Sequence, residues 1–195
     1  MKKDGKLKGK DLINIGIYAA IYCVIMTAIA MLGFIPIMMP MLCILVPLLC
    51  GIPYMLFITK VEKFGMITIY AIIVGLFLWI TGMGYWPFVF GIIFGLIADF
   101  TAKTGNYKNS TRSVLSAGNF SIVIFGNFVP LFINANEYFK TRQSFGSDYI
   151  NELTDIMSHS WLIPALLAAT VVCGIIGGLI GKAVLKKHFV KAGIA

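Results

Sequence analysis

Long hydrophobic stretches alternate with short polar ones along this chain. Each stretch approaches the ~20 apolar residues that an α-helix needs to cross the hydrocarbon core of a bilayer. Six stretches are expected to form membrane-spanning helices, over residues 12–32, 36–59, 66–81, 85–100, 114–133 and 161–185. The pattern predicts an all-α integral membrane protein whose residues 1–195 form a single six-helix membrane domain.

Prolines and polar residues mark the expected interruptions. Pro40, Pro47 and Pro53 all fall in the second stretch. Each proline lacks the N–H of a helical residue, so this helix is expected to be bent or partly broken. The longest polar segment lies between the fifth and sixth stretches, over residues 134–158, and its part 148–157 is predicted to form a short surface helix.

Composition excludes a soluble protein. The chain is 59% hydrophobic and has a mean hydropathy of +0.90, which is more apolar surface than a soluble domain of this length can bury. Its four cysteines all lie in hydrophobic stretches, and their spacing matches no zinc or redox motif. We therefore expect them to be small apolar core residues.

The distribution of charge predicts the orientation. With six spans, both termini and the loops at 60–65 and 99–113 lie on one side of the membrane. Of the 16 Lys and Arg residues, only Lys140 and Arg142 fall on the other side. Because loops rich in Lys and Arg stay in the cytoplasm, both termini are expected to be cytoplasmic. The net charge of +8 is then a topology signal, and it gives no reason to expect nucleic-acid binding.

The chain carries no recognisable catalytic motif. It contains no HExxH zinc motif, no nucleophile elbow and no Walker A loop, so we expect no enzymatic activity. Asp99 lies near the cytoplasmic end of the fourth stretch and is expected to be solvated or paired with a lysine. No carboxylate or histidine falls in the middle of a stretch, which disfavours an ion-coupled carrier.

Two small residues in the first stretch form a candidate helix-packing motif. Gly16 and Ala20 are four positions apart, so on a helix they share one face and let another helix approach closely. The spacing fits either packing within this protein or contact with another membrane subunit.

The chain resembles the substrate-binding S-components of energy-coupling factor (ECF) transporters, which import vitamins and other micronutrients into prokaryotic cells. The resemblance is carried by a basic N-terminus before Gly16-xxx-Ala20, where the family typically has Ala-xxx-Ala, and by six spans in 195 residues. The C-terminal segments 177–182 (GGLIGK) and 185–193 (LKKHFVKAG) are similar to the Trep_Strep or MptD-like branch.

The resemblance implies a substrate-binding subunit in the plasma membrane of a prokaryote, which captures heme or a vitamin-like molecule at the outer face. In the family, the small residues of the first span contact a transmembrane ECF subunit, and two ATPase subunits drive transport. We therefore expect ATP hydrolysis in these partners, Gly16 and Ala20 at the partner interface, and no intrinsic cofactor. The alternatives are a structural or regulatory membrane subunit without a ligand, and a self-contained small carrier.

Asn127 is the leading polar candidate for ligand binding. It lies in the fifth stretch, two helical turns from Asn119 on the same face, and a buried amide in a membrane should face the bundle interior. Pro130 leaves the Gly126 carbonyl without its helical donor, which adds a second polar group nearby. Hydrogen bonding between helices is the alternative role for both asparagines.

Aromatic and methionine side chains at the outer ends of the spans could form the rest of a ligand site. Tyr85, Trp86 and Trp161 fit either an interfacial aromatic belt or a wall that stacks on a flat ligand. Met38 and Met39 fit either adaptable contacts with a ligand or ordinary packing.

His159 is the candidate metal ligand, and only for heme. It precedes Trp161 at the predicted outer mouth, where simple interfacial exposure is the alternative. If heme is the transported molecule, as the resemblance allows, His159 could be an axial ligand of its iron.

Overall fold

The computed structural model describes residues 6–140 and 145–189, and every regular element in these two ranges is helical. In chain order the elements are α1 (Gly9–Ala30), η1 (Met31–Phe34), α2 (Met38–Ile58), α3 (Met66–Leu78), η2 (Trp79–Met83), α4 (Trp86–Lys103), α5 (Ser110–Phe125), α6 (Val129–Ile133), α7 (Ala135–Lys140), α8 (Ser147–Met157), α9 (Leu162–Val184) and η4 (Leu185–Phe189). The predicted all-α fold is confirmed.

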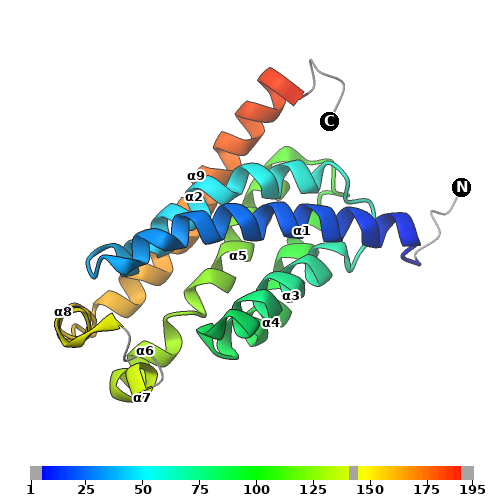
Figure 1. Cartoon of the computed structure of the whole chain (residues 1–195). Coiled ribbons are helices and arrows are strands. Elements are labelled where there is room, and N and C mark those ends of the chain that lie inside the picture. The colour runs from blue at the N-terminus through cyan, green and yellow to red at the C-terminus, as the bar shows by residue number, and fades with distance from the viewer. Residues whose placement is uncertain (1–5, 141–144, 190–195) are drawn as a thin grey trace, which may run out of the picture.

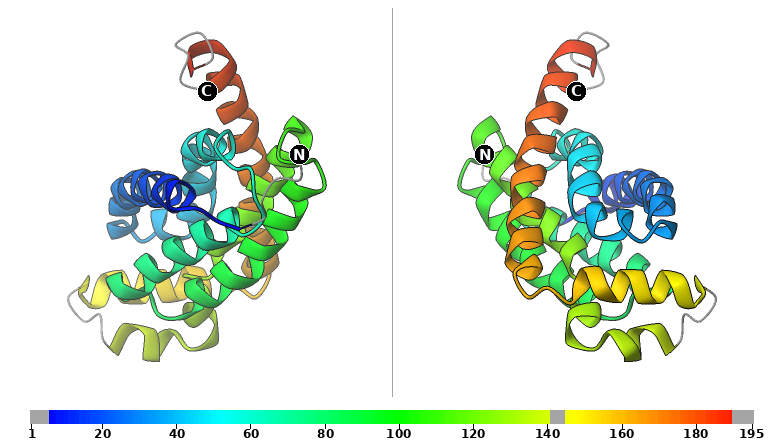
Figure 2. Two further views of the ribbon diagram at one scale, coloured as in Figure 1. Left: turned by 90° about the vertical axis from the view of Figure 1, so that its right-hand side faces the viewer. Right: turned by 90° about the vertical axis from the view of Figure 1, so that its left-hand side faces the viewer.

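The six long helices form a closed ring. α1 packs against α2, α2 against α9, α9 against α5, α5 against α4, α4 against α3, and α3 against α1. α2 also contacts α5 across the ring. The start of α1 and the end of α9 lie at one end of this bundle, and α7 and α8 lie together across the other end (Figures 1 and 2).

Within the described residues, five helical segments are long and apolar enough to cross a membrane: Gly9–Phe34, Met38–Ile58, Met66–Met83, Trp86–Lys103 and Leu162–Lys187. Large apolar side chains cover their outward faces. Ile17 on α1, Phe100 on α4 and Val172 on α9, for example, each expose more than half of their surface. These faces are suited to lipid contact.

The fifth hydrophobic stretch differs from the continuous helix expected over 114–133. α5 ends at Phe125, a turn covers residues 126–128, and α6 begins at Val129. Pro130 cannot donate to the Gly126 carbonyl, which favours a break here. Gly126 itself packs tightly against the start of α4, since a Cβ at this position would lie 3.0 Å from the Cα of Pro87.

The second stretch is not broken, because α2 continues through Pro47 and Pro53. Its packing against α9 depends on glycine. A Cβ added to Gly51 would overlap the backbone of Gly177, and one added to Gly177 would overlap the Pro47 carbonyl. The absence of side chains at Gly51 and Gly177 lets the two backbones touch, as in other close helix pairs in membranes.

The expectation that Asp99 would be solvated or paired with a lysine is wrong. It is fully buried, and its Oδ2 accepts hydrogen bonds from the backbone N–H groups of Gly65, Ile67 and Thr68 at 2.8, 3.1 and 3.1 Å. The Thr68 hydroxyl also donates to Oδ2. Gly65 has no side chain with which to cap α3, so a carboxylate from α4 caps it instead.

Tyr107 holds the other oxygen of this carboxylate. Its hydroxyl donates to Oδ1 of Asp99 at 2.9 Å, from the loop between α4 and α5. Burial, followed by the adjacent Asp99 charge, raises the pKa of the Tyr107 phenol far above its usual value. The hydroxyl therefore stays protonated and remains a donor at physiological pH. Asp99 thus joins α3, α4 and this loop.

The cysteines and the surface helix agree with the sequence predictions. Cys23, Cys43 and Cys50 are buried, Cys173 is half-buried, and all four are free thiols. The predicted helix over 148–157 is confirmed as α8, whose Leu153 is fully buried while its acidic residues lie toward the exterior.

Candidate functional site

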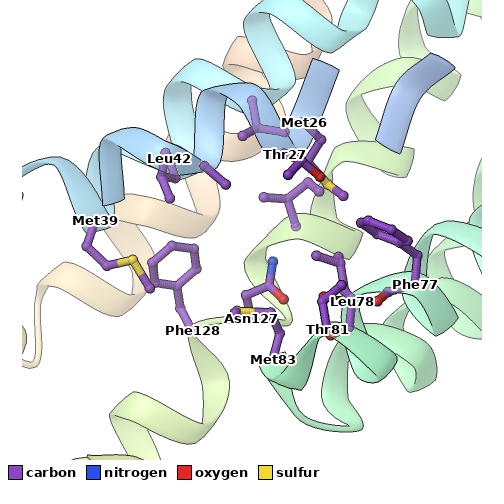
Figure 3. A pocket seen from close by; sticks show the side chains of 13 residues that line it. Met26, Thr27, Met39, Leu42, Phe77, Leu78, Thr81, Met83, Asn127 and Phe128 are labelled. Carbon is purple, nitrogen blue, oxygen red and sulfur yellow. Dashed lines mark hydrogen bonds between the residues drawn. The ribbon is translucent and has the colours of Figure 1, made fainter. Parts of the chain in front are cut away.

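A cavity of about 160 Å³ lies where α1, α2, η2 and the turn after α5 meet (Figure 3). Its walls are mostly apolar. Phe77 and Phe128 supply aromatic rings, and three methionines approach from different elements. These methionines are Met26, Met39 and Met83.

The cavity belongs to the end of the bundle that carries α7 and α8. It is formed by the C-terminal parts of α1, α3 and α5 and by the N-terminal part of α2. α8 packs on this end, because the Tyr149 hydroxyl donates to the carbonyl of Gly33 at 2.5 Å and the rings of Phe145 and Phe34 lie 5.8 Å apart. The cavity therefore lies under a layer of short helices.

Basic residues gather at the opposite end of the bundle. The Lys63 ammonium pairs with Asp11 at 2.7 Å and donates to the Lys6 carbonyl, which joins the loop after α2 to the start of α1. Lys103 lies over the ring of Phe64, 4.8 Å from its centroid. The basic end and the cavity end are thus different ends of the same bundle.

Asn127 is one of three polar residues that line the cavity, with Thr27 and Thr81. It lies in the turn between α5 and α6, and its amide projects from there between Thr81, Met83 and Phe128 (Figure 3). Its Oδ1 is buried and has no hydrogen-bond partner among the described residues. Tyr70 Oη and Ser110 Oγ are also buried without a partner in the described part of the chain, so this atom does not by itself indicate a ligand.

The hydroxyl groups of the two threonines in the lining already donate hydrogen bonds to backbone carbonyls. The Thr27 hydroxyl donates to the Cys23 carbonyl at 2.8 Å. The Thr81 hydroxyl donates to the carbonyls of Phe77 and Leu78, each at 3.0 Å. These bonds are local to each helix, so neither threonine offers its proton to a molecule in the cavity.

The structure does not bring the predicted ligand residues together in one place. Asn127 and Met39 line the cavity, whereas Met38 is half-buried and does not. Tyr85 and Trp86 line a separate groove of about 310 Å³ with Pro130, and Met83 borders both spaces.

His159 and Trp161 lie away from the cavity. Both side chains are exposed in the connection between α8 and α9, with ring centroids 6.5 Å apart. Nδ1 of His159 is 3.3 Å from the Ile156 carbonyl oxygen. Neither residue is part of the cavity lining.

Gly16 and Ala20 lie on the exposed face of α1, so they do not serve packing within this chain. They line a shallow groove of about 480 Å³ between α1 and α3. A Cβ added to Gly16 would meet nothing within 4 Å. Thr27 and Phe77 line both this groove and the cavity, so the two features share a wall.

Several lining residues were not singled out by their sequence. Met26, Thr27, Phe77 and Phe128 are ordinary residues of hydrophobic stretches, and nothing local distinguishes them. Met83 had a signal, because it lies between two glycines that adopt φ values of 90° and 87°. Such a sharply turned segment can hold a side chain over a cavity.

Comparison with known protein families gives a match over most of the chain. The sequence model of a family described as hypothetical bacterial integral membrane protein (Trep_Strep) matches residues 9–191. No curated protein and no solved structure matches the chain.

Proposed function

The chain belongs to the Trep_Strep family of bacterial integral membrane proteins, and on that premise we propose that it is the substrate-binding subunit of an ECF-type importer. As a multi-pass protein of a bacterial membrane, it captures a small nutrient in the cavity beside Asn127. A transmembrane ECF subunit and two ATPases, which hydrolyse the ATP, complete the transporter.

The observation that carries this proposal is an apolar cavity, bordered by Asn127, at the end of the bundle opposite the basic end. Under the positive-inside rule the basic end is cytoplasmic, so the cavity lies in the outer half of the bundle, beneath α7 and α8, on the side where a nutrient is captured. A cavity at the outer end of the bundle favours a ligand-binding subunit over a structural subunit without a ligand.

The exposed face of α1 supports the proposed assembly with a transmembrane ECF subunit. Gly16 and Ala20 leave a groove in which a partner helix can approach the α1 backbone. A self-contained carrier would not require such a face.

The size of the cavity favours a ligand smaller than heme. Its volume of about 160 Å³ is close to that of an engineered cavity, ~150 Å³, that binds benzene. A porphyrin contains four linked rings, and His159 lies outside this space. Heme binding through His159 would therefore need another surface.

The proposed assembly can be tested by placing larger side chains in the α1 groove that Gly16 and Ala20 line. Gly16→Leu and Ala20→Leu should each reduce co-purification of the ECF subunit and ATPases at least tenfold. Because Gly16 has open space around it, Gly16→Leu should leave the isolated protein as stable as the wild type.

Ala168→Leu on α9 is the matched control, since it adds the same bulk to an exposed alanine away from α1. It should assemble normally. Full assembly and transport by both α1 variants would refute the partner face, and failure of the wild type to co-purify with any ATPase would refute the transporter assignment.

A further inference from the structure

We infer that the cavity takes up a small, uncharged, apolar ring of about the size of benzene, and that this molecule enters from the outer leaflet of the bilayer through a mouth between α1 and η2. This inference rests on the proposed role as a substrate-binding subunit, and it narrows the substrate class and adds a route of entry. The size and surface of the cavity support the class, and the exposed part of its lining supports the route.

The volume of the cavity limits the ligand to about one ring. It is about 160 Å³, and an engineered protein cavity of ~150 Å³ binds benzene. Phe77 and Phe128 can contact the faces or edges of such a ring. Met26, Met39 and Met83 can adapt to its outline, because methionine side chains are flexible and polarisable.

The surface that faces the cavity is almost entirely apolar. Among the described residues of the lining, none is acidic or basic, so a charged ligand would lose its hydration without gaining an ion pair. The hydroxyls of Thr27 and Thr81 donate to nearby backbone carbonyls, and the Oδ1 of Asn127 is buried from the cavity. A polar ligand would therefore find few partners, whereas apolar cavities of this size stay dry and bind apolar molecules.

The exposed lining residues locate the mouth of the cavity. Val46 and Phe128 are at most 2% exposed and belong to its closed interior. Thr27 and Ala30 on α1 and Thr81 on η2 line the same cavity but are exposed at the surface. The cavity thus opens at the side of the bundle, between α1 and the end of α3 that continues into η2 (Figure 3).

This mouth faces the position of the lipid. The segments Gly9–Phe34 and Met66–Met83, which carry the three mouth residues, are long and apolar enough to cross a membrane. Met31 and Ile80, beside the mouth residues in the sequence, expose more than half of their surface. Because α7 and α8 lie across the end of the bundle above the cavity (Figure 1), the side opening is the more direct route for an apolar molecule dissolved in the outer leaflet.

The mouth also borders the α1 groove that is the proposed partner face. Thr27 and Phe77 line both spaces, and no charged residue belongs to the described lining of the groove. A partner helix in this groove would lie beside the mouth, so the substrate should enter before the subunits assemble.

The test follows the methionine methyl groups by NMR in the purified protein in lipid nanodiscs, with benzene as the probe. An aromatic ring shifts the resonances of nearby methyl groups, so Met26, Met39 and Met83 should show saturable shifts in the millimolar range. Met55 and Met66, which are buried outside the cavity, should not. Benzoate, which adds a charge to the same ring, should cause no saturable shift at the three cavity methionines.

Variants at the mouth test the route. Ala30→Phe should weaken benzene binding or slow its exchange by about tenfold or more, and Thr27→Phe should do the same. Ala28→Phe is the matched control, because Ala28 is exposed on α1 and does not line the cavity. Tyr149→Phe removes the hydrogen bond that joins α8 to the Gly33 carbonyl, and it should leave the exchange rate unchanged because α8 is not on the route.

No saturable benzene shift at the cavity methionines, or equal shifts with benzoate, would overturn the substrate class. Equal effects of Ala30→Phe and Ala28→Phe, or faster exchange in Tyr149→Phe, would overturn the route. These outcomes are separate from the failure of the proposed function, because benzene binding requires neither the ECF subunit nor the ATPases.

Discussion

Replacing Asp99 tests the capping network that joins α3, α4 and the following loop. Asp99→Ala removes the acceptor for the N–H groups of Gly65, Ile67 and Thr68. Each buried donor left without a partner costs about 1–3 kcal/mol. Water can reach the part-buried Gly65 N–H, so we expect a total loss of about 3–5 kcal/mol, in the range measured for broken buried charge networks.

Two milder substitutions should cause smaller losses of folding stability than Asp99→Ala. Tyr107→Phe removes one hydrogen bond to a charged group and should cost about 1.5 kcal/mol. Asp99→Asn keeps one acceptor oxygen for α3, and the Tyr107 hydroxyl can accept from the new NH₂ group. Its cost should fall between those of Tyr107→Phe and Asp99→Ala.

The assay is thermal unfolding of the purified protein in detergent, followed by tryptophan fluorescence and by size-exclusion chromatography. With ~2–4 °C per kcal/mol for a chain of this size, Asp99→Ala should lower the Tm by about 6–20 °C. Glu152→Ala, which removes an exposed carboxylate on α8, is the control and should stay within ~0.5 kcal/mol of the wild type. A Tm for Asp99→Ala equal to that of the control would refute the capping argument.

Two further predictions test packing and orientation. Gly177→Ala should destabilise the protein by about 1–3 kcal/mol or prevent folding, because the added Cβ would overlap the α2 backbone. The same thermal unfolding assay measures this loss. A Tm equal to that of the wild type would contradict the close packing of α2 and α9. In a background with Cys173→Ser, a membrane-impermeant maleimide should label Ser147→Cys in intact cells and Lys108→Cys only after permeabilisation, since the two exposed positions lie at opposite ends of the bundle. The reverse labelling pattern would reject the orientation.

Much of the fold could be predicted from the sequence because hydrophobic stretches of membrane length leave few alternatives to helices. The interruption at 126–128 was harder to place, since Pro130 marks a freed carbonyl but does not require the chain to turn there. Asp99 was misjudged for a physical reason: its partners are backbone N–H groups of α3 that lie 31 to 34 positions earlier in the chain. Sequence neighbours give no sign of such a bond.

Some residues of the candidate site could likewise be predicted from the sequence, and others could not. Asn127 could be identified because an amide in a hydrophobic stretch must face the interior, and Met39 because it lies near the outer end of a span. Phe77 and Thr81 become lining residues only when α3 is placed beside α1 and α5. That arrangement depends on long-range packing, and one sequence does not reveal it.

The closed ring of helices has a consequence for how the protein is made. α9 is synthesised after the other five long helices of the ring, yet it packs against both α2 and α5. Until α9 arrives, the glycine face of α2 has no helix to pack against, and the ring remains open on that side. The ring therefore cannot close before α9 has been synthesised, and its closure requires α9 to enter a gap that the earlier helices must keep available.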